Sequence, residues 1–209
     1  MIRRVLLLAI TALALVTVSG CIGGGGQAPP PIDQGAIKAA IGAVIDGFED
    51  AVEAYDVDGM LARLSGAGFK LTLQEGGQSY TKDFARLESE LAADEPYQLQ
   101  WRKPADQGGY GYALDLVLGT QTFSNITATG AIVTQTHEVY ESSTRLDINR
   151  LKTDNGTITW HFAKISGEWK ATAMTITFEP VQMAGAVARV QAAESRGFGF
   201  GTGAPNLRH

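Results

Sequence analysis

Four ionisable side chains on predicted β-strands are the residues of this chain that could transfer protons. They are His137, Asp115, Tyr112 and Tyr140. A histidine or a carboxylate can move a proton when its surroundings tune its pKa, and a tyrosine hydroxyl can stabilise an enolate by hydrogen bonding. A cavity that held these groups together would therefore suit an isomerase or a dehydratase.

Strand alternation divides the four candidates between two faces of the predicted sheet. Successive side chains of a strand point to opposite faces. Tyr140 therefore lies on the face opposite to His137, and Asp115 on the face opposite to Tyr112. No register places all four in one cavity. A single histidine on a partly apolar strand is more often a hydrogen-bonded structural residue than a base, so no catalytic residue is assigned.

An apolar wall on the last predicted hairpin is the candidate binding surface. Trp160 and Phe162 share a face of one strand, and Met174, Ile176 and Phe178 share a face of the next. Two interpretations remain open. Helices could cover this wall as part of the core. Alternatively, the wall lines a pocket that admits a small apolar or peptidic ligand.

Residues 1–20 have the layout of a signal peptide. Arg3 and Arg4 precede an apolar run over residues 5–18, which is shorter than the roughly 20 residues that a bilayer span needs. The run ends in the residues VSGC (18–21), which resemble the lipobox of bacterial lipoproteins. The resemblance implies that Cys21 is diacylated and becomes the mature N-terminus. An uncleaved anchor or an ordinary secretory signal is the alternative.

The expected location is the cell envelope, with a lipid anchor in the membrane. Residues 21–32 are rich in glycine and proline and predict a tether between lipid and domain. Ile22 follows the cysteine where an aspartate would favour inner-membrane retention. The lipoprotein rule therefore favours the outer membrane in a Gram-negative host, whereas a Gram-positive host would carry the protein on the outer face of its plasma membrane.

Charge and residue types exclude several other functions. Without Arg3 and Arg4 the chain has 15 Lys and Arg against 22 Asp and Glu, a net charge near −7 that disfavours binding to nucleic acid or anionic lipid. His137, His161 and His209 stand at unrelated spacings, and lipidation of Cys21 would leave no free thiol. No metal site and no cofactor is therefore predicted.

Residues 33–180 are predicted to form one domain that begins with helices. Asp33 caps a first helix of about six turns, whose apolar residues recur every three or four positions. Asp58 is expected to cap a short second helix over residues 60–64. Calcium binding by Asp56 and Asp58 is the weaker alternative, because the later ligands of a calcium loop are missing. A third helix is expected from Asp83 to just before Pro96.

The remaining segments of the domain are predicted strands. A first hairpin turns at Gly76-Gly77, the Asn155-Gly156 pair is expected to form a tight turn, and Ser166-Gly167 turns the last hairpin. The expected strands cover residues 69–73, 97–103, 110–118, 131–140, 144–151, 157–165 and 168–178. Residues 181–209 are predicted as a tail that is partly helical and then disordered.

This pattern predicts an α+β fold, in which N-terminal helices pack on a curved antiparallel sheet of about four to six strands. It resembles the cone-shaped, cystatin-like domains of the nuclear transport factor 2-like superfamily over about residues 37–178. The resemblance is carried by FEDAVEAYDVDGML (48–61), GAIV (130–133) and FAKISGEWK (162–170). It implies a cone interior in which enzyme members keep an acid, a histidine or a tyrosine.

The predicted function is that of a lipid-anchored cell-envelope protein, acting as a non-catalytic binding or interaction module. One alternative is a small cone-pocket enzyme with isomerase-like or dehydratase-like acid–base chemistry. Another is a structural subunit of an envelope assembly. The expected partners are the membrane, through the lipid, a small apolar or peptidic ligand, and a second copy that pairs through the sheet face, which the resemblance implies.

Overall fold

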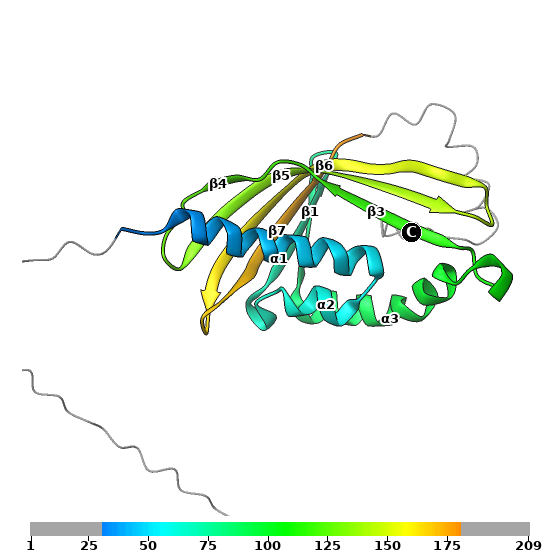
Figure 1. Cartoon of the computed structure of the whole chain (residues 1–209), viewed down its shortest axis with the longest axis horizontal. Helices are drawn as coiled ribbons and strands as arrows, with labels where there is room; N and C mark the ends of the chain where they lie inside the picture. The colour runs from blue at the N-terminus through cyan, green and yellow to red at the C-terminus, as the bar shows by residue number, and fades with distance from the viewer. Residues whose placement is uncertain (1–30, 181–209) are drawn as a thin grey trace, which may run out of the picture. The chain divides into compact units, whose positions relative to one another are not determined.

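The computed structural model describes residues 31–180 of the 209-residue chain, so Cys21, the predicted signal peptide and the predicted tail lie outside the described residues (Figure 1). Helices come first in this range and a long sheet follows. The elements are α1 (Gln34–Ala54), α2 (Val57–Ala62), η1 (Gly66–Gly68), β1 (Lys70–Glu75), β2 (Gln78–Asp83), α3 (Phe84–Arg102), η2 (Ala105–Gln107), β3 (Tyr112–Leu118), β4 (Thr122–Ser124), β5 (Gly130–Ser143), β6 (Ile148–Ile165) and β7 (Glu168–Phe178).

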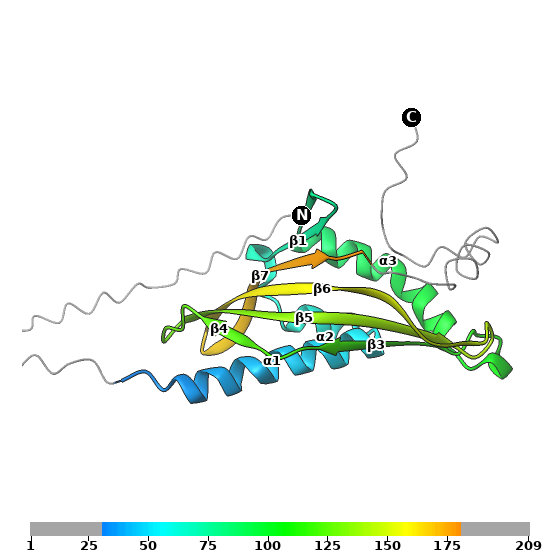
Figure 2. The same ribbon diagram turned by 90° about the horizontal axis from the view of Figure 1, so that it is seen from above.

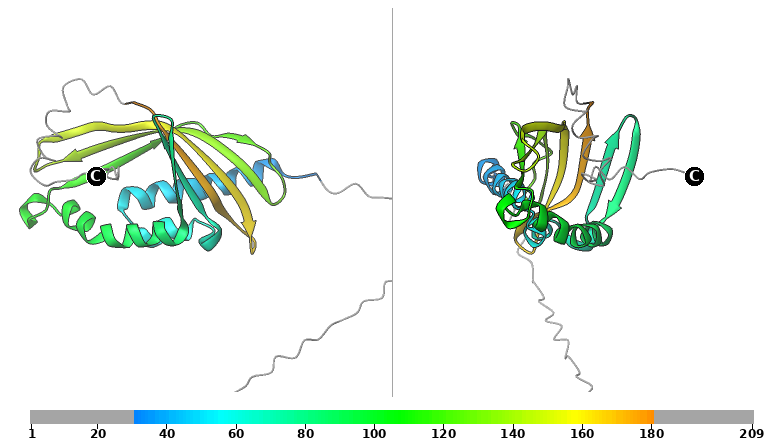
Figure 3. Two further views of the ribbon diagram at one scale, coloured as in Figure 1. Left: turned by 180° about the vertical axis from the view of Figure 1, so that it is seen from behind. Right: turned by 90° about the vertical axis from the view of Figure 1, so that its right-hand side faces the viewer.

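The strands form one curved, seven-stranded sheet against which the helices pack (Figures 2 and 3). The strand order is β2-β1-β7-β6-β5-β3, and β4 pairs with the part of β5 that β3 leaves free. All pairs are antiparallel except β1 with β7, which run parallel. The predicted class of helices on a curved sheet is confirmed, and the sheet gains a parallel pair because β1 joins the last strand.

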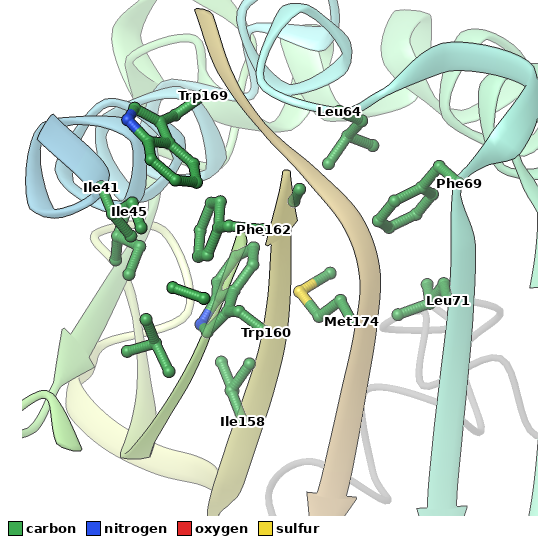
Figure 4. Packing of buried hydrophobic residues seen from close by; sticks show 13 residues of the cluster. Ile41, Ile45, Leu64, Phe69, Leu71, Ile158, Trp160, Phe162, Trp169 and Met174 are labelled. Carbon is green, nitrogen blue, oxygen red and sulfur yellow. The ribbon is translucent and has the colours of Figure 1, made fainter. Parts of the chain in front are cut away.

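The hydrophobic core lies between α1 and the first part of β5, the last part of β6, β7 and the start of β1 (Figure 4). Ile41 and Ile45 on α1 are fully buried, as is Val133 on β5. The Trp160 ring stacks on Phe162 at 5.9 Å and meets Phe48 of α1 edge-on at 5.2 Å. Burial of each such side chain contributes about 1.5–3 kcal/mol. We call the sheet face that carries Trp160 the inner face, and the opposite face the outer face.

The first helices begin and end at identifiable caps. The Asp33 carboxylate accepts a hydrogen bond from the Ala36 N–H at 2.9 Å, and Tyr55 ends α1 in a left-handed conformation, with φ of 54°. Asp56, not the predicted Asp58, caps α2, because its side chain accepts from the Gly59 N–H at 3.0 Å. Within residues 31–180, no helix combines the length and apolar character needed to cross a bilayer.

Helix α3 corrects the prediction that a helix ends before Pro96 and that residues 97–103 form a strand. The helix starts at Phe84, with Asp83 as its cap, and continues through Pro96 to Arg102. Tertiary contacts hold its second half, since Trp101 packs edge-on against Tyr110 and Tyr112, with 6.4 Å between ring centroids in each pair. These contacts outweigh the helix-breaking tendency of an exposed proline.

Strand β6 corrects the prediction of a tight turn at Asn155-Gly156. Both residues lie inside a continuous strand, where Gly156 pairs with His137 and Phe178. The chain turns instead between β5 and β6, at residues 144–147, part of the segment predicted as a strand. The Ser143 hydroxyl accepts the Leu146 N–H of this turn at 3.3 Å and donates to the Tyr110 carbonyl at 2.8 Å.

The two glycine-containing turns at the ends of the sheet are confirmed. Gly76 and Gly77 join β1 to β2 with φ of 55° and 83°, and Ser166-Gly167 joins β6 to β7 with φ of 52° and 92°. All four values lie in the left-handed region that two-residue hairpin turns require. Both turns bring strands together in the predicted order.

The outer face is lined with threonines. Register partners from β4 to β2 form one row across six strands: Thr122, Thr134, Thr159, Thr175, Thr72 and Thr81. Within this row the hydroxyls of Thr72 and Thr81 lie 3.3 Å apart. Threonine fits a half-exposed pleated surface well, so the row stabilises the sheet. A homodimer through this face stays a prediction.

The Gly156→Ala variant tests whether glycine is required for space inside β6. A Cβ at this position would collide with the Thr177 carbonyl oxygen and lie 3.1 Å from Cε1 of His137. We expect urea denaturation to show a loss of about 3 kcal/mol or more. The control is Gly76→Ala, where no atom lies within 4 Å and only the positive φ opposes a side chain. That variant should lose about 1 kcal/mol, and equal losses would contradict the steric explanation.

Candidate functional site

The structure places the four predicted proton-transfer residues on two faces. His137 and Tyr112 lie on the inner face and are buried, with 3% and 8% of their surfaces exposed. On the outer face, Asp115 accepts a hydrogen bond from Nε of Arg150 at 3.0 Å, and the Tyr140 hydroxyl donates to Glu138 at 2.5 Å. The separation deduced from strand alternation therefore holds.

Two polar side chains on the inner face of β5 are buried without a hydrogen-bond partner. Gln135 and His137 are each 3% exposed, and neither the amide of Gln135 nor either ring nitrogen of His137 has a hydrogen-bond partner among residues 31–180. The indole N–H of Trp160 on β6 shares this condition. Each such group costs about 1–3 kcal/mol when it loses water without a replacement. These atoms are the candidates on the inner face for hydrogen bonds with a ligand.

The His137 ring lies over Gly156 and beside Phe178. Its Cε1 atom would be only 3.1 Å from a Cβ at position 156, and its ring meets Phe178 edge-on at 5.9 Å between centroids. Burial lowers the pKa of His137, while the negative charge of Glu179 opposes that change. The imidazole is therefore neutral at pH 7, and it can donate one hydrogen bond and accept another.

Two acids lie on the inner face beyond His137. Burial raises the pKa of Glu141, although hydrogen bonds with Tyr112 and with the Thr153 hydroxyl, at 3.4 Å, favour its charged form. Burial also raises the pKa of Asp154 to about 6, helped by repulsion from Glu75 and Glu141. The Asn155 N–H, 2.7 Å from the Asp154 carboxylate, opposes that rise. Asp154 can therefore gain or lose a proton near neutral pH.

Strand alternation in the sequence indicates the face on which both acids lie. Asp154 shares strand parity with Ile158 and Trp160, so a continuous β6 places it on the inner face. Glu141 has the parity of His137 but stands one residue beyond the predicted end of its strand. Without the predicted turn at Asn155-Gly156, alternation would have identified Asp154, and a strand longer by one residue would have included Glu141.

A group of polar contacts joins the helices to β3 next to these acids. The Arg102 side chain donates to the Glu53 carbonyl oxygen, and its guanidinium lies 5.6 Å and 5.7 Å from the ring centroids of Tyr55 and Tyr112. The Glu53 carboxylate accepts the Leu116 N–H at 2.9 Å. Burial lowers the pKa of Arg102 and raises the pKa of both tyrosines. These contacts fix Tyr112, which in turn orients Glu141.

The predicted apolar wall divides into core residues and one residue at the edge of the site. Trp160, Phe162 and Met174 are at most 4% exposed and belong to the core, with Ile176 packed against it. Phe178 instead contacts His137 and lines a hollow of about 370 Å³, which is formed by residues 74–79 and 177–178. A ligand-binding role for this wall stays a prediction, and Phe178 is the member closest to the polar groups.

The residues between 31 and 180 contain no cluster of three or more histidines, cysteines, aspartates or glutamates that could hold a metal ion. The prediction of two carboxylates in a calcium loop concerned Asp56 and Asp58. Asp56 is engaged in capping α2. The inner face of β5 and β6, with Gln135, His137, Glu141 and Asp154, is therefore the candidate site.

Comparison with known proteins shows the fold of the domain. Neither a protein-family model nor a curated protein matches the chain. A nuclear transport factor 2-like protein with a cystatin-like fold from Novosphingobium aromaticivorans aligns with 74% of this chain and 88% of its own, at a TM-score of 0.50 and 15% identity. The chain has this cystatin-like fold.

Two further structures from the same species share the fold. A protein assigned as the beta subunit of an aromatic-ring-hydroxylating dioxygenase aligns with 72% of this chain and 94% of its own, at a TM-score of 0.56 and 9% identity. A protein assigned as a scytalone dehydratase aligns with 69% and 85%, at a TM-score of 0.50 and 11% identity. The nuclear transport factor 2-like fold therefore serves different functions, and the side chains of this chain must indicate its own.

The Asp154→Asn variant tests whether this acid is strained by its surroundings. Because its pKa is raised in the folded state, Asp154 favours folding below its unfolded value of about 4, and this contribution is lost as pH rises through about 6. The neutral variant should therefore be more stable than the wild type at pH 8, by about 1–2 kcal/mol after allowance for partial exposure. The gain should disappear near pH 4 in urea denaturation.

The matched control for this prediction is Asp115→Asn on the outer face. Asp115 is exposed and pairs with Arg150, so its replacement should change the free energy of unfolding by less than about 1 kcal/mol. It should also give no gain at pH 8. If Asp154→Asn gave no gain at pH 8 either, the burial of Asp154 would not be the origin of a raised pKa.

Proposed function

We propose that this protein is a lipid-anchored cell-envelope protein that binds a small molecule against the inner face of its sheet and does not transform it. The observation that carries this proposal is the pair Gln135 and His137, which are almost fully buried and have no hydrogen-bond partner in the part of the chain that the structure describes. A folded protein rarely leaves such groups unpaired. A ligand that hydrogen-bonds them would remove their energetic cost.

The surroundings of the pair suit a ligand with an apolar body. Val139 and Phe178 lie beside His137 on the same face, and Leu116 and Leu118 of β3 are register partners of Val139 and His137. Small-molecule sites are commonly apolar surfaces with a few well-placed polar groups. The inner face beyond the core therefore has the composition of a binding site.

The envelope location is supported by the sequence. The VSGC motif with a charged start, an apolar run and the only cysteine of the chain fits lipidation at Cys21. The Gly- and Pro-rich residues that follow would hold the domain away from the membrane. A tethered binding domain could then collect or store its ligand at the membrane surface.

Ligand retention tests the binding proposal. We expect native mass spectrometry of the full chain, extracted from its host in mild detergent, to show a bound small molecule. Gln135→Leu and His137→Leu should each lose that molecule and also gain stability, by about 1 kcal/mol or more, because an unpaired buried polar group has been removed. Thr134→Val on the outer face of the same strand is the control and should retain the ligand. A wild-type protein that carries nothing would contradict the proposal.

Labelling with palmitate tests the anchor. Wild-type protein should incorporate labelled palmitate and sediment with membranes, because each buried methylene of an acyl chain contributes about 0.8 kcal/mol. Cys21→Ser should lose the label and appear in the soluble fraction. The chain contains one cysteine, so the substitution removes the single thiol that a lipid could modify. Label that persists in the variant would exclude lipidation at Cys21.

A small acid–base enzyme is the second candidate, and Asp154 favours it. A carboxyl group with a pKa of about 6 on a partly buried face can both accept and return a proton near neutral pH. Deuterium exchange from water into a C–H bond of the co-purified molecule would support catalysis if Asp154→Asn abolished it. Binding without exchange would support the non-catalytic module.

A further inference from the structure

Acids on the two faces of the sheet differ in whether they form ion pairs with lysine or arginine. On the outer face, Glu138 pairs with Lys152 at 2.5 Å and Asp115 with Arg150 at 2.9 Å. The other ion pairs in the described part of the chain join Glu90 to Lys82 and Arg86, and Glu168 to Lys170. None of the pairs involves Glu141, Asp154 or Glu75. The inner acids are therefore left without a cation from residues 31–180.

These unpaired acids lie together. Asp154 is the register partner of Val139, and Glu141 is two residues further along β5 on the same face, which places the two acids diagonally across neighbouring strands. A register shift lies between Val139 and Tyr140, next to the two acids, and repulsion from Glu141 contributes to the raised pKa of Asp154. Glu75 also acts on Asp154, since repulsion from both glutamates contributes to the raised pKa of Asp154. A positive charge between them would relieve this repulsion.

An independent observation directs a ligand to the same place. The His137 ring lies over Gly156. Gly156 is two residues from Asp154 on β6, so both positions are on the inner face of the strand. His137 is 3% exposed, and among the described residues neither its two ring nitrogens nor the amide of Gln135 on the same strand has a hydrogen-bond partner. Neutral hydrogen-bonding groups and uncompensated carboxylates therefore line one continuous stretch of the inner face.

We propose that this stretch binds a small organic cation, a protonated amine on an apolar body, with the ammonium group at Asp154 and Glu141 and a hydrogen-bonding group at His137 and Gln135. This inference rests on the proposed function as a small-molecule binding module. It adds the chemical class of the ligand.

Aromatic rings favour an organic cation over a metal ion. Tyr112 hydrogen-bonds with Glu141, and Phe178 packs against His137, so a ring stands near each end of the stretch. An ammonium group gains from both carboxylates and ring faces, and an apolar body gains from burial. A calcium ion instead prefers six to eight oxygen ligands. Two carboxylates beside apolar and aromatic side chains therefore suit an organic ammonium ion better than a calcium ion.

Matched probes test the charge requirement. Isothermal titration calorimetry would compare 2-phenylethylamine, the uncharged 2-phenylethanol and the anion phenylacetate on the full chain in detergent at pH 8, where Asp154 is ionised. The chain would first be freed of any co-purified molecule by dialysis. The amine should bind at least about 10-fold more tightly than the alcohol, and phenylacetate should not bind.

Substitutions then locate the charge. Asp154→Asn and Glu141→Gln keep the shape of each side chain, and each should weaken amine binding by about 10-fold while leaving the weak binding of the alcohol unchanged. Glu138→Gln on the outer face is the control and should bind the amine as the wild type does. Circular dichroism of each variant confirms folding.

The outcomes separate this inference from the proposed function. Equal binding of alcohol and amine, amine binding that survives both substitutions, or calcium binding in place of amine binding would overturn the inference. A neutral molecule found on the host-purified protein would also overturn it while supporting the proposed function. If no amine binds and no small molecule accompanies the protein from its host, both fail.

Discussion

The packing of α1 on β5 and β6 is the constraint on which the rest of the domain depends. Phe48 and Trp160 meet edge-on, and the fully buried Ile41, Ile45 and Val133 close around them. The polar groups begin directly after this contact, with Gln135 two residues beyond Val133. The position of α1 therefore separates the apolar core of the inner face from its polar part.

Predictions from sequence succeeded where local chemistry and periodicity agreed. The first helix, the Gly76-Gly77 turn, the Ser166-Gly167 turn and the face of His137 all followed from caps, positive φ values and strand alternation. They failed where contacts distant in sequence decided the outcome. Trp101 holds α3 beyond Pro96, and the pairing of β6 with both neighbours extends it through Asn155-Gly156. That second failure broke β6 in two and hid Asp154, whereas Glu141 was missed because the predicted strand over residues 131–140 ended one residue before it.

The residues of the candidate site lower the stability of the folded protein. Unpaired polar atoms at Gln135 and His137 and uncompensated charge at Asp154 and Glu141 all oppose folding, whereas the acids of the outer face are neutralised by lysine and arginine. Functional sites are where a protein is expected to break the rules that its core obeys. The core formed by α1 and the central strands is separate from the site, and its apolar burial compensates for this loss of stability.

The Asn155-Gly156 pair inside β6 also affects the chemical degradation of the molecule. In a flexible chain, an asparagine followed by glycine readily cyclises to a succinimide and hydrolyses to isoaspartate, because the glycine nitrogen can reach the side-chain carbonyl. In β6 the backbone is extended and paired on both sides, and Gly156 is buried between His137 and Phe178. The reaction is therefore blocked until the strand separates. Isoaspartate at this position would therefore accumulate with the total time that β6 spends separated from its neighbouring strands.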